Sequence, residues 1–175
     1  ARARVWTAKD SEGRLRSYAS LSLDGVTFTA PRETRNELEL RYGRFDPTEE
    51  GPVVPEKLRA QRSNRLFVVQ YHTQGLEDYR DVLRELGAEV HLFLAHNANV
   101  VELEPSRLAT VRALPFVRAV RPFHPAYKLE EELLQSVMAA STGPVRVNLL
   151  VMARGDDARV AAWIEAQGGS VFERS

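Results

Sequence analysis

The sequence lacks cysteine entirely and carries no net charge. Without cysteine the chain can form no disulfide, and it offers neither a thiol nucleophile nor a cysteine metal ligand. This absence leaves the compartment open, because cytosolic proteins and larger secreted bacterial proteins both manage without disulfides. Basic and acidic residues number 24 each, so no broad positive field draws the chain onto nucleic acid. We therefore expect no nucleic-acid partner.

Long hydrophobic runs are missing too. The longest, around 66–69 and 147–152, have the length of a strand and fall well short of the roughly 20 residues that cross a bilayer. The sequence therefore predicts no membrane span. The chain begins at Ala1 without a methionine or an apolar leader, so we expect a processed or trimmed product. Its hydrophobic content of 43% fits one ordinary globular domain or two small ones.

The short motifs that carry catalysis or hold cofactors are absent as well. There is no Gly-x-Ser-x-Gly elbow, no glycine-rich phosphate loop and no His-Glu-x-x-His pair. The histidines are His72, His91, His96 and His124. No two of them have the helical spacing that is typical of a metal site. We expect this chain alone to have no catalytic residue, no metal and no cofactor.

What the sequence does contain begins with a β-rich segment over residues 1–45. The stretches 15–23 and 26–29 flank Asp24-Gly25, which is a turn signal, and together they predict a hairpin. Residues 36–44 alternate charged and apolar side chains, a period of two that predicts a further strand with one face in water.

Prolines dominate the next segment, residues 46–64. Pro47, Pro52 and Pro55 surround Gly51, a composition that keeps the backbone extended and interrupts regular structure. We interpret this segment as a linker. A surface loop packed on the following domain is an equally good interpretation.

The clearest pattern runs through residues 65–127. Strand character marks 66–71, 90–94, 100–103 and 116–120. Tyr79, Val82 and Leu83 recur at helical spacing before the stop signal Gly87, which predicts an amphipathic helix. A second helix is predicted between Pro105 and Pro115. The order strand, helix, strand, strand, helix, strand predicts an α+β domain with the ferredoxin-like split βαβ arrangement, βαββαβ.

In that arrangement both helices cover one face of the sheet, and we expect the other face to be bare. Side chains alternate along a strand, so Leu66, Val68 and Gln70 project to one face while their neighbours project to the other. We predict that these three residues form a partner-binding face.

A connecting helix or linker is expected over residues 128–144, followed by a second, truncated copy of the domain over 145–175. The segment from Arg65 aligns without gaps with the segment from Arg146, although a chance match between two strand-helix-strand units stays open. A truncated copy would lack the strand that lies between its first two, and open strand edges are sticky. We expect another chain to supply that strand, with Ser175 as a candidate processing site.

Pieces of residues 65–129 resemble the propeptides of bacterial subtilisin-like serine proteases. They are LFVVQYHT (66–73), LRELGAEV (83–90) and ALPFVRAVRPFHPAYKL (113–129), and RYGRFDP (41–47) is similar to the lead-in. The resemblance implies a secreted or cell-envelope domain that helps its protease to fold and then inhibits it. The partner would be the remainder of the same serine endopeptidase precursor, including the protease domain, held as a separate non-covalent chain.

Two other functions compete with this one. A tandem ferredoxin-like regulatory or scaffolding module would bind a protein partner or a small ligand without any protease. RNA binding on the bare sheet would need aromatic platforms among basic residues, and Phe67 and Tyr71 are too few for it.

Overall fold

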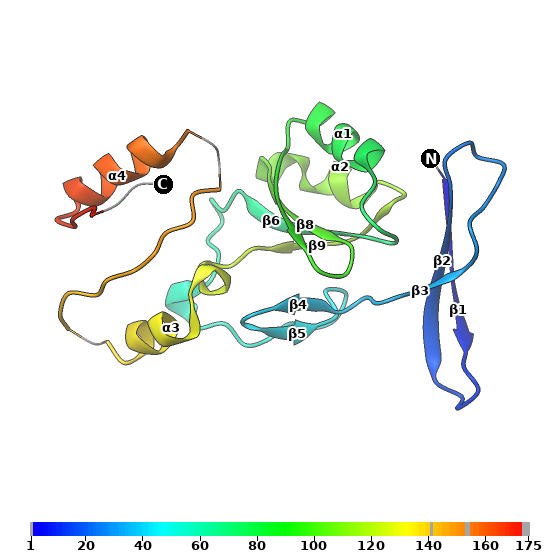
Figure 1. Ribbon diagram of the computed structural model, residues 1–175, viewed down its shortest axis with the longest axis horizontal. Coiled ribbons are helices and arrows are strands. Elements are labelled where there is room, and N and C mark those ends of the chain that lie inside the picture. Colours follow the sequence, from blue (N-terminus) through cyan, green and yellow to red (C-terminus); the bar gives the residue numbers. More distant parts are fainter. Residues whose placement is uncertain (1, 141, 153–154, 173–175) are drawn as a thin grey trace. The chain divides into compact units, whose positions relative to one another are not determined.

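The computed structural model describes residues 2–140, 142–152 and 155–172. It contains two compact units, Ala1–Ala140 and Ser141–Ser175 (Figure 1). The described residues form α-helices and three antiparallel sheets, so the chain is of the α+β class. No helix among them combines the length and the apolar character that crossing a membrane requires.

The first sheet has the order β1-β2-β3, with β1 at Arg2–Lys9, β2 at Leu15–Ser22 and β3 at Arg32–Thr34. Its hairpin turn is organised by Asp10, whose carboxylate accepts backbone hydrogen bonds from Glu12 and Arg14 at 2.9 Å each. This sheet confirms a β-rich N-terminal segment but corrects the expected pairing of its strands.

The predicted hairpin between 15–23 and 26–29 is wrong, because β2 pairs with β1 and β3, and residues 26–29 are in no strand. The turn at Asp24-Gly25 does form: the Asp24 carboxylate accepts the backbone N–H groups of Val26 and Thr27 at 2.8 Å. After it, the backbone bonds back to β2 through Thr29, whose N–H donates to the Leu21 carbonyl at 2.8 Å. The paired strand starts only at Arg32.

The single strand predicted over 36–44 is also wrong. The chain turns at Arg41 and Tyr42, which gives two short antiparallel strands, β4 at Leu38–Leu40 and β5 at Gly43–Phe45. Alternation of polar and apolar residues continues across a tight turn, so the period alone does not reveal where the strand reverses.

The four-stranded sheet holds the strands expected between 65 and 127. They are β6 at Leu66–Tyr71, β7 at Glu89–Leu94, β8 at Ala98–Glu102 and β9 at Val117–Pro122. The sheet is antiparallel throughout, and its order is β7-β8-β6-β9. Helix α1 (Glu77–Glu85) follows β6, and helix α2 (Leu108–Arg112) precedes β9.

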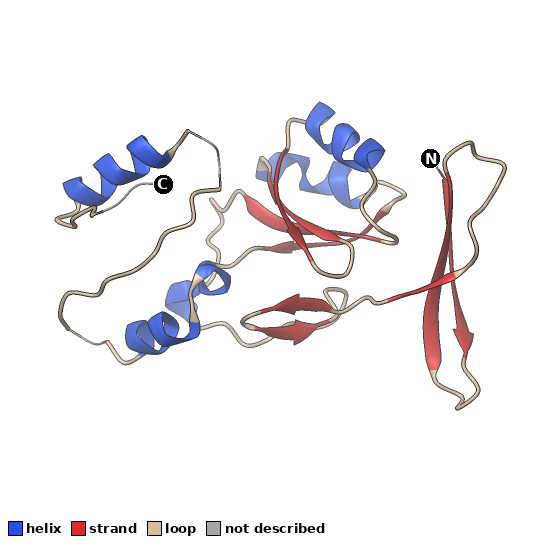
Figure 2. Ribbon diagram, in the orientation of Figure 1, coloured by secondary structure: helices blue, strands red, loops and turns tan. Residues whose placement is uncertain are grey.

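Both helices cover the same face of this sheet, as Figure 2 shows. The core between helices and sheet contains Phe67, Val69 and Tyr71 of β6, with Leu83 of α1 and Val111 of α2. Helix α1 ends at Glu85, and Gly87 follows with a left-handed φ of +83° that glycine adopts without strain. The predicted helix, its stop signal and its buried face are therefore confirmed.

Short helices complete the elements of the first unit. The 3₁₀ turns η1 (Glu56–Leu58), η2 (Pro105–Arg107) and η3 (Pro125–Lys128) precede β6, α2 and α3 respectively. The helix expected within 128–144 is α3, Glu131–Met138.

The second unit contains helix α4, Asp157–Ala166, at the position expected for the helix of a repeated unit. The flanking segments expected as strands differ: among the described residues, neither 146–152 nor 170–172 forms a strand or joins a sheet. A strand depends on hydrogen bonds to a neighbour, and apolar sequence alone does not supply one. Completion of this unit by another chain stays a prediction, and Ser175 lies outside the described residues.

Candidate partner-binding surfaces

The predicted site residues do share one face of β6, opposite the helices. Leu66, Val68 and Gln70 pair in register with Glu102, Val100 and Ala98 of β8. However, Val68 and Gln70 are each only 1% exposed, and Leu66 is half-buried. The expectation that this face is bare is therefore wrong.

Residues 36–60, called here the covering segment, lie over this face. Gln70 Nε2 donates to the Asn36 carbonyl at 2.8 Å, and Arg121 Nε donates to the Pro47 carbonyl at 2.5 Å. In Figure 1 the strands β4 and β5 lie on the side of the sheet away from α1 and α2. The segment also contributes the buried side chains of Leu38 and Val54.

The proline-rich part of the covering segment is consequently a packed loop, and its interpretation as a free linker is wrong. The Ala60 backbone N–H donates to His124 Nδ1 at 2.9 Å. His124 lies just after β9, so this bond holds the C-terminal end of the covering segment there. Proline keeps the backbone extended without an N–H donor, so such a segment can lie across a sheet through its carbonyl groups. The alternative of a surface loop on the following domain fits these contacts.

Arg118 of β9 connects the covering segment to the sheet. Its Nη1 donates to Gln70 Oε1 at 2.7 Å and to Asp46 Oδ1 at 2.8 Å, while Nη2 donates to Asp46 Oδ2 at 2.6 Å. Burial by itself would raise the pKa of Asp46, but hydrogen bonds from Arg118 and Thr48 outweigh it and lower that pKa to about 2. Asp46 is therefore an ionised anchor.

An aromatic cluster joins the two ends of the stretch that carries the family resemblance. The Tyr127 ring lies 5.2 Å from Tyr42, 6.4 Å from Phe45 and 5.8 Å from Phe123, measured between ring centroids. The first two belong to the lead-in RYGRFDP, and the others follow β9. Contacts of this kind add to the apolar burial of the rings, so the lead-in packs as part of the domain.

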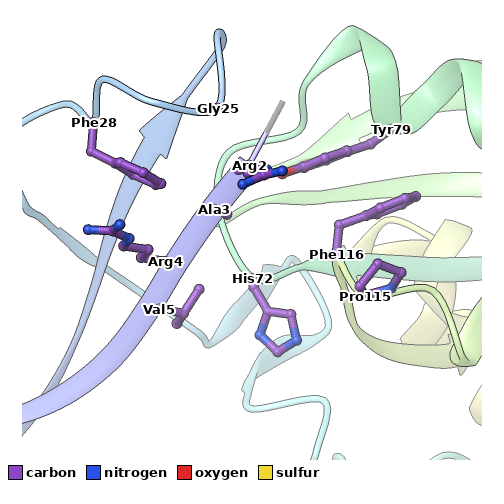
Figure 3. Close-up of a pocket in the computed structure, with 10 residues that line it drawn as sticks. All are labelled: Arg2, Ala3, Arg4, Val5, Gly25, Phe28, His72, Tyr79, Pro115 and Phe116. Carbon is purple, nitrogen blue, oxygen red and sulfur yellow. The ribbon is translucent and has the colours of Figure 1, made fainter.

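A pocket of about 440 Å³ opens beside α1 (Figure 3). The stacked rings of Tyr79 and Phe116, with centroids 4.3 Å apart, contribute to its lining together with His72. Arg2 and Arg4 of β1 add two guanidinium groups, and Arg4 lies 3.8 Å over the Phe28 ring. Such a lining suits an apolar group with a negative charge.

The electrostatics of the pocket favour a neutral imidazole. Burial lowers the pKa of His72, and the nearby Arg118 lowers it further. Sequence reasoning missed this pocket because its residues come from four separate stretches of the chain. The sequence holds no local signal for it.

The second unit exposes many apolar side chains for its size. Among them are Leu149, Leu150, Trp163 and Phe172, and Trp163 is 64% exposed. In α4, the small Ala161 is buried. Exposed apolar side chains in such number are typical of a surface that another protein covers.

One group of three potential metal ligands occurs among the described residues: Glu89 and His91 of β7 with Glu102 of β8. The sequence predicts no metal site because no two histidines have helical spacing. A cross-strand group is invisible to that test, because its members meet only when two strands pair.

Comparison with known proteins adds one match. Residues 39–124 match the model of a family described as a domain of unknown function, DUF8729. No curated protein matches the chain, and no solved structure does. The matched stretch begins in β4 and ends just after β9, so it contains most of the covering segment as well as the whole four-stranded sheet. The match therefore spans the sheet together with most of its cover.

Proposed function

We propose that residues 65–127 form a ferredoxin-like domain and that the chain is the non-catalytic propeptide of a secreted, bacterial subtilisin-like serine protease. The observation that carries this proposal is the strand order β7-β8-β6-β9, antiparallel throughout, with both helices on one face. Two interleaved βαβ units produce this order. The resemblance in residues 65–129 covers the same elements.

The buried sheet face changes how such a propeptide would hold its protease. Contact through Val68 or Gln70 would first require the covering segment to leave, which breaks the Arg118–Asp46 and Gln70–Asn36 hydrogen bonds. The exposed apolar residues of the second unit need no such rearrangement. We therefore place the contact with the protease domain there, in keeping with a second unit that another chain completes.

A regulatory or scaffolding module is the second candidate function. The covered sheet face favours it, because a domain that closes its own sheet needs no protease to lie against it. In this case the partner would be a protein on the second unit, or a small anionic ligand in the pocket that Arg2 and Arg4 line.

Enzyme inhibition and assisted refolding separate the two candidates. The purified chain is titrated into a subtilisin-like serine protease, with a chymotrypsin-like serine protease as the control enzyme, while hydrolysis of a small peptide substrate is followed. In parallel, the denatured subtilisin-like enzyme is refolded with and without the chain. The propeptide proposal expects selective inhibition and a faster return of activity.

A matched pair of variants locates the contact. Leu149→Asp should weaken inhibition, whereas Leu15→Asp, at an exposed position of β2 in the first unit, should leave it unchanged. Absence of both inhibition and assisted refolding, with the chain shown intact by mass spectrometry, would contradict the propeptide function and favour the scaffold.

A further inference from the structure

The sheet edge at β7 brings three metal-binding side chains together. Glu89 and Glu102 are direct partners in the β7–β8 ladder, and His91 lies two residues beyond Glu89. One ligand atom from each lies within 4.8 Å of the other two. His91 Nδ1 is 3.7 Å from Glu89 Oε1, and His91 Nε2 is 3.5 Å from Glu102 Oε2.

Both separations are too long for good hydrogen bonds. One imidazole nitrogen binds one ion, so the Nε2–Glu102 Oε2 distance is the one that suits two ligands of a shared ion, and the exposed Glu89 side chain would turn toward that same ion. An imidazole and a carboxylate each bound about 2.0 to 2.1 Å from a tetrahedral Zn²⁺ lie roughly 3.4 Å apart. Within the described part of the chain, no hydrogen bond involves either nitrogen of His91, although its side chain is only 5% exposed. The arrangement leaves the imidazole lone pair open to a cation.

The charges and the backbone of the β7–β8 ladder also favour a cation at this position. Two glutamates directly opposite each other in a ladder repel; Arg65, which pairs with Glu102, offsets part of this repulsion, and a cation bound between the two carboxylates would offset the rest. The β7–β8 register shifts between Val90 and Phe93, which takes His91 out of the regular alternation of side chains. Bulges of this kind re-aim a side chain and are common next to functional sites.

Arg65 orients one of the ligands from outside the group. Its Nε donates to Glu102 Oε1 at 3.1 Å, and its Nη1 lies 2.5 Å from Glu104 Oε1. The Glu102 carboxylate is thus held by one oxygen, while Oε2 is directed toward His91. Partners that hold a ligand in this way are a regular feature of metal sites.

We infer that Glu89, His91 and Glu102 bind a divalent transition metal, for which Zn²⁺ is the best match. An imidazole with two carboxylates selects Zn²⁺ over Mg²⁺ and Ca²⁺, which prefer oxygen ligands alone. Three protein ligands leave a fourth position for water. The ion would bridge the edge strand β7 to β8 and cancel the repulsion of the two glutamates. This inference is independent of the proposed protease partner.

Calorimetric titration of the untagged full chain with zinc chloride tests the inference. We expect one Zn²⁺ per chain and no heat from Mg²⁺ or Ca²⁺ at the same concentrations. His91→Gln and Glu102→Gln should each weaken Zn²⁺ binding by about tenfold or more. Glu104→Gln, which alters another partner of Arg65 but no ligand, should bind Zn²⁺ as the parent chain does.

A second measurement distinguishes loss of a metal ligand from loss of the fold. Co²⁺ in place of Zn²⁺ should give a visible absorption band whose loss in His91→Gln is accompanied by an unchanged circular dichroism spectrum. Glu89→Gln, at an exposed position, provides a ligand variant with little risk to folding. Unchanged Zn²⁺ affinity in the three ligand variants, or an equal loss in Glu104→Gln, would overturn the site.

Discussion

The Arg118 guanidinium holds the Asp46 carboxylate through two parallel hydrogen bonds, Nη1–Oδ1 at 2.8 Å and Nη2–Oδ2 at 2.6 Å. The two side chains are 14% and 20% exposed, so the pair is largely withdrawn from water. Because Arg118 belongs to β9 and Asp46 to the covering segment, this one contact joins the sheet to its cover. Paired bonds of this geometry are among the stronger polar contacts in proteins.

Removing the charge of Asp46 should loosen the covering segment. We expect Asp46→Asn to lower the free energy of unfolding by about 2 kcal/mol, the usual range for a hydrogen bond to a charged group. Urea unfolding measures this loss, and amide hydrogen exchange should accelerate over residues 46–59. Glu39→Gln, which breaks the exposed Glu39–Arg44 pair, is the matched control and should cost less than about 1 kcal/mol. Equal effects of the two substitutions would contradict the anchoring role.

The same carboxylate predicts a pH dependence. In the folded chain the pKa of Asp46 is lowered from 3.8 to about 2. A group whose pKa falls on folding stabilises the native state above its unfolded pKa, and this contribution disappears as the pH drops through the folded pKa. We therefore expect the parent chain to lose stability relative to Asp46→Asn between about pH 4 and pH 2. Unfolding midpoints of both chains at several pH values give the difference. A constant difference across that range would argue against the shift.

Truncating the helix-side core should destabilise the first unit strongly. Leu83 of α1 is fully buried, so Leu83→Ala should cost about 3 kcal/mol of unfolding free energy through lost burial and the cavity left behind. Leu15 is 71% exposed, and Leu15→Ala should change that free energy by less than about 0.5 kcal/mol. Chemical denaturation of both variants checks the contrast. Similar losses in the two would mean that α1 does not pack as described.

Trp163 should report directly on the surface of the second unit. In a Trp6→Phe variant it is the remaining tryptophan, and its 64% exposure predicts strong quenching of its fluorescence by acrylamide. When a protein covers this surface, the emission should shift to shorter wavelength and quenching should fall. Trp163→Phe serves as the control, since its remaining Trp6 lies in the first unit. A partner that binds without altering Trp163 emission would locate the contact elsewhere.

The elements between 65 and 122 follow closely from the sequence. Runs of β-branched and aromatic residues gave β6 and β9, and helical spacing gave α1 with its stop at Gly87. These signals are local, because strand and helix periods repeat every two and 3.6 residues along the chain. Before residue 45 the turns at Asp10 and Arg41 decide how the strands pair. In this region the local sequence pattern did not predict which strands pair.

The sites depended on contacts that no local pattern records. Strand character by itself determined which residues of β6 share a face, because side chains alternate along a strand. Whether that face meets water was decided by the tertiary structure alone, since residues 36–60 cover it from a distant part of the sequence. Burial is a property of the segments that meet in space. For the same reason Glu89, His91 and Glu102 became a group only when β7 paired with β8.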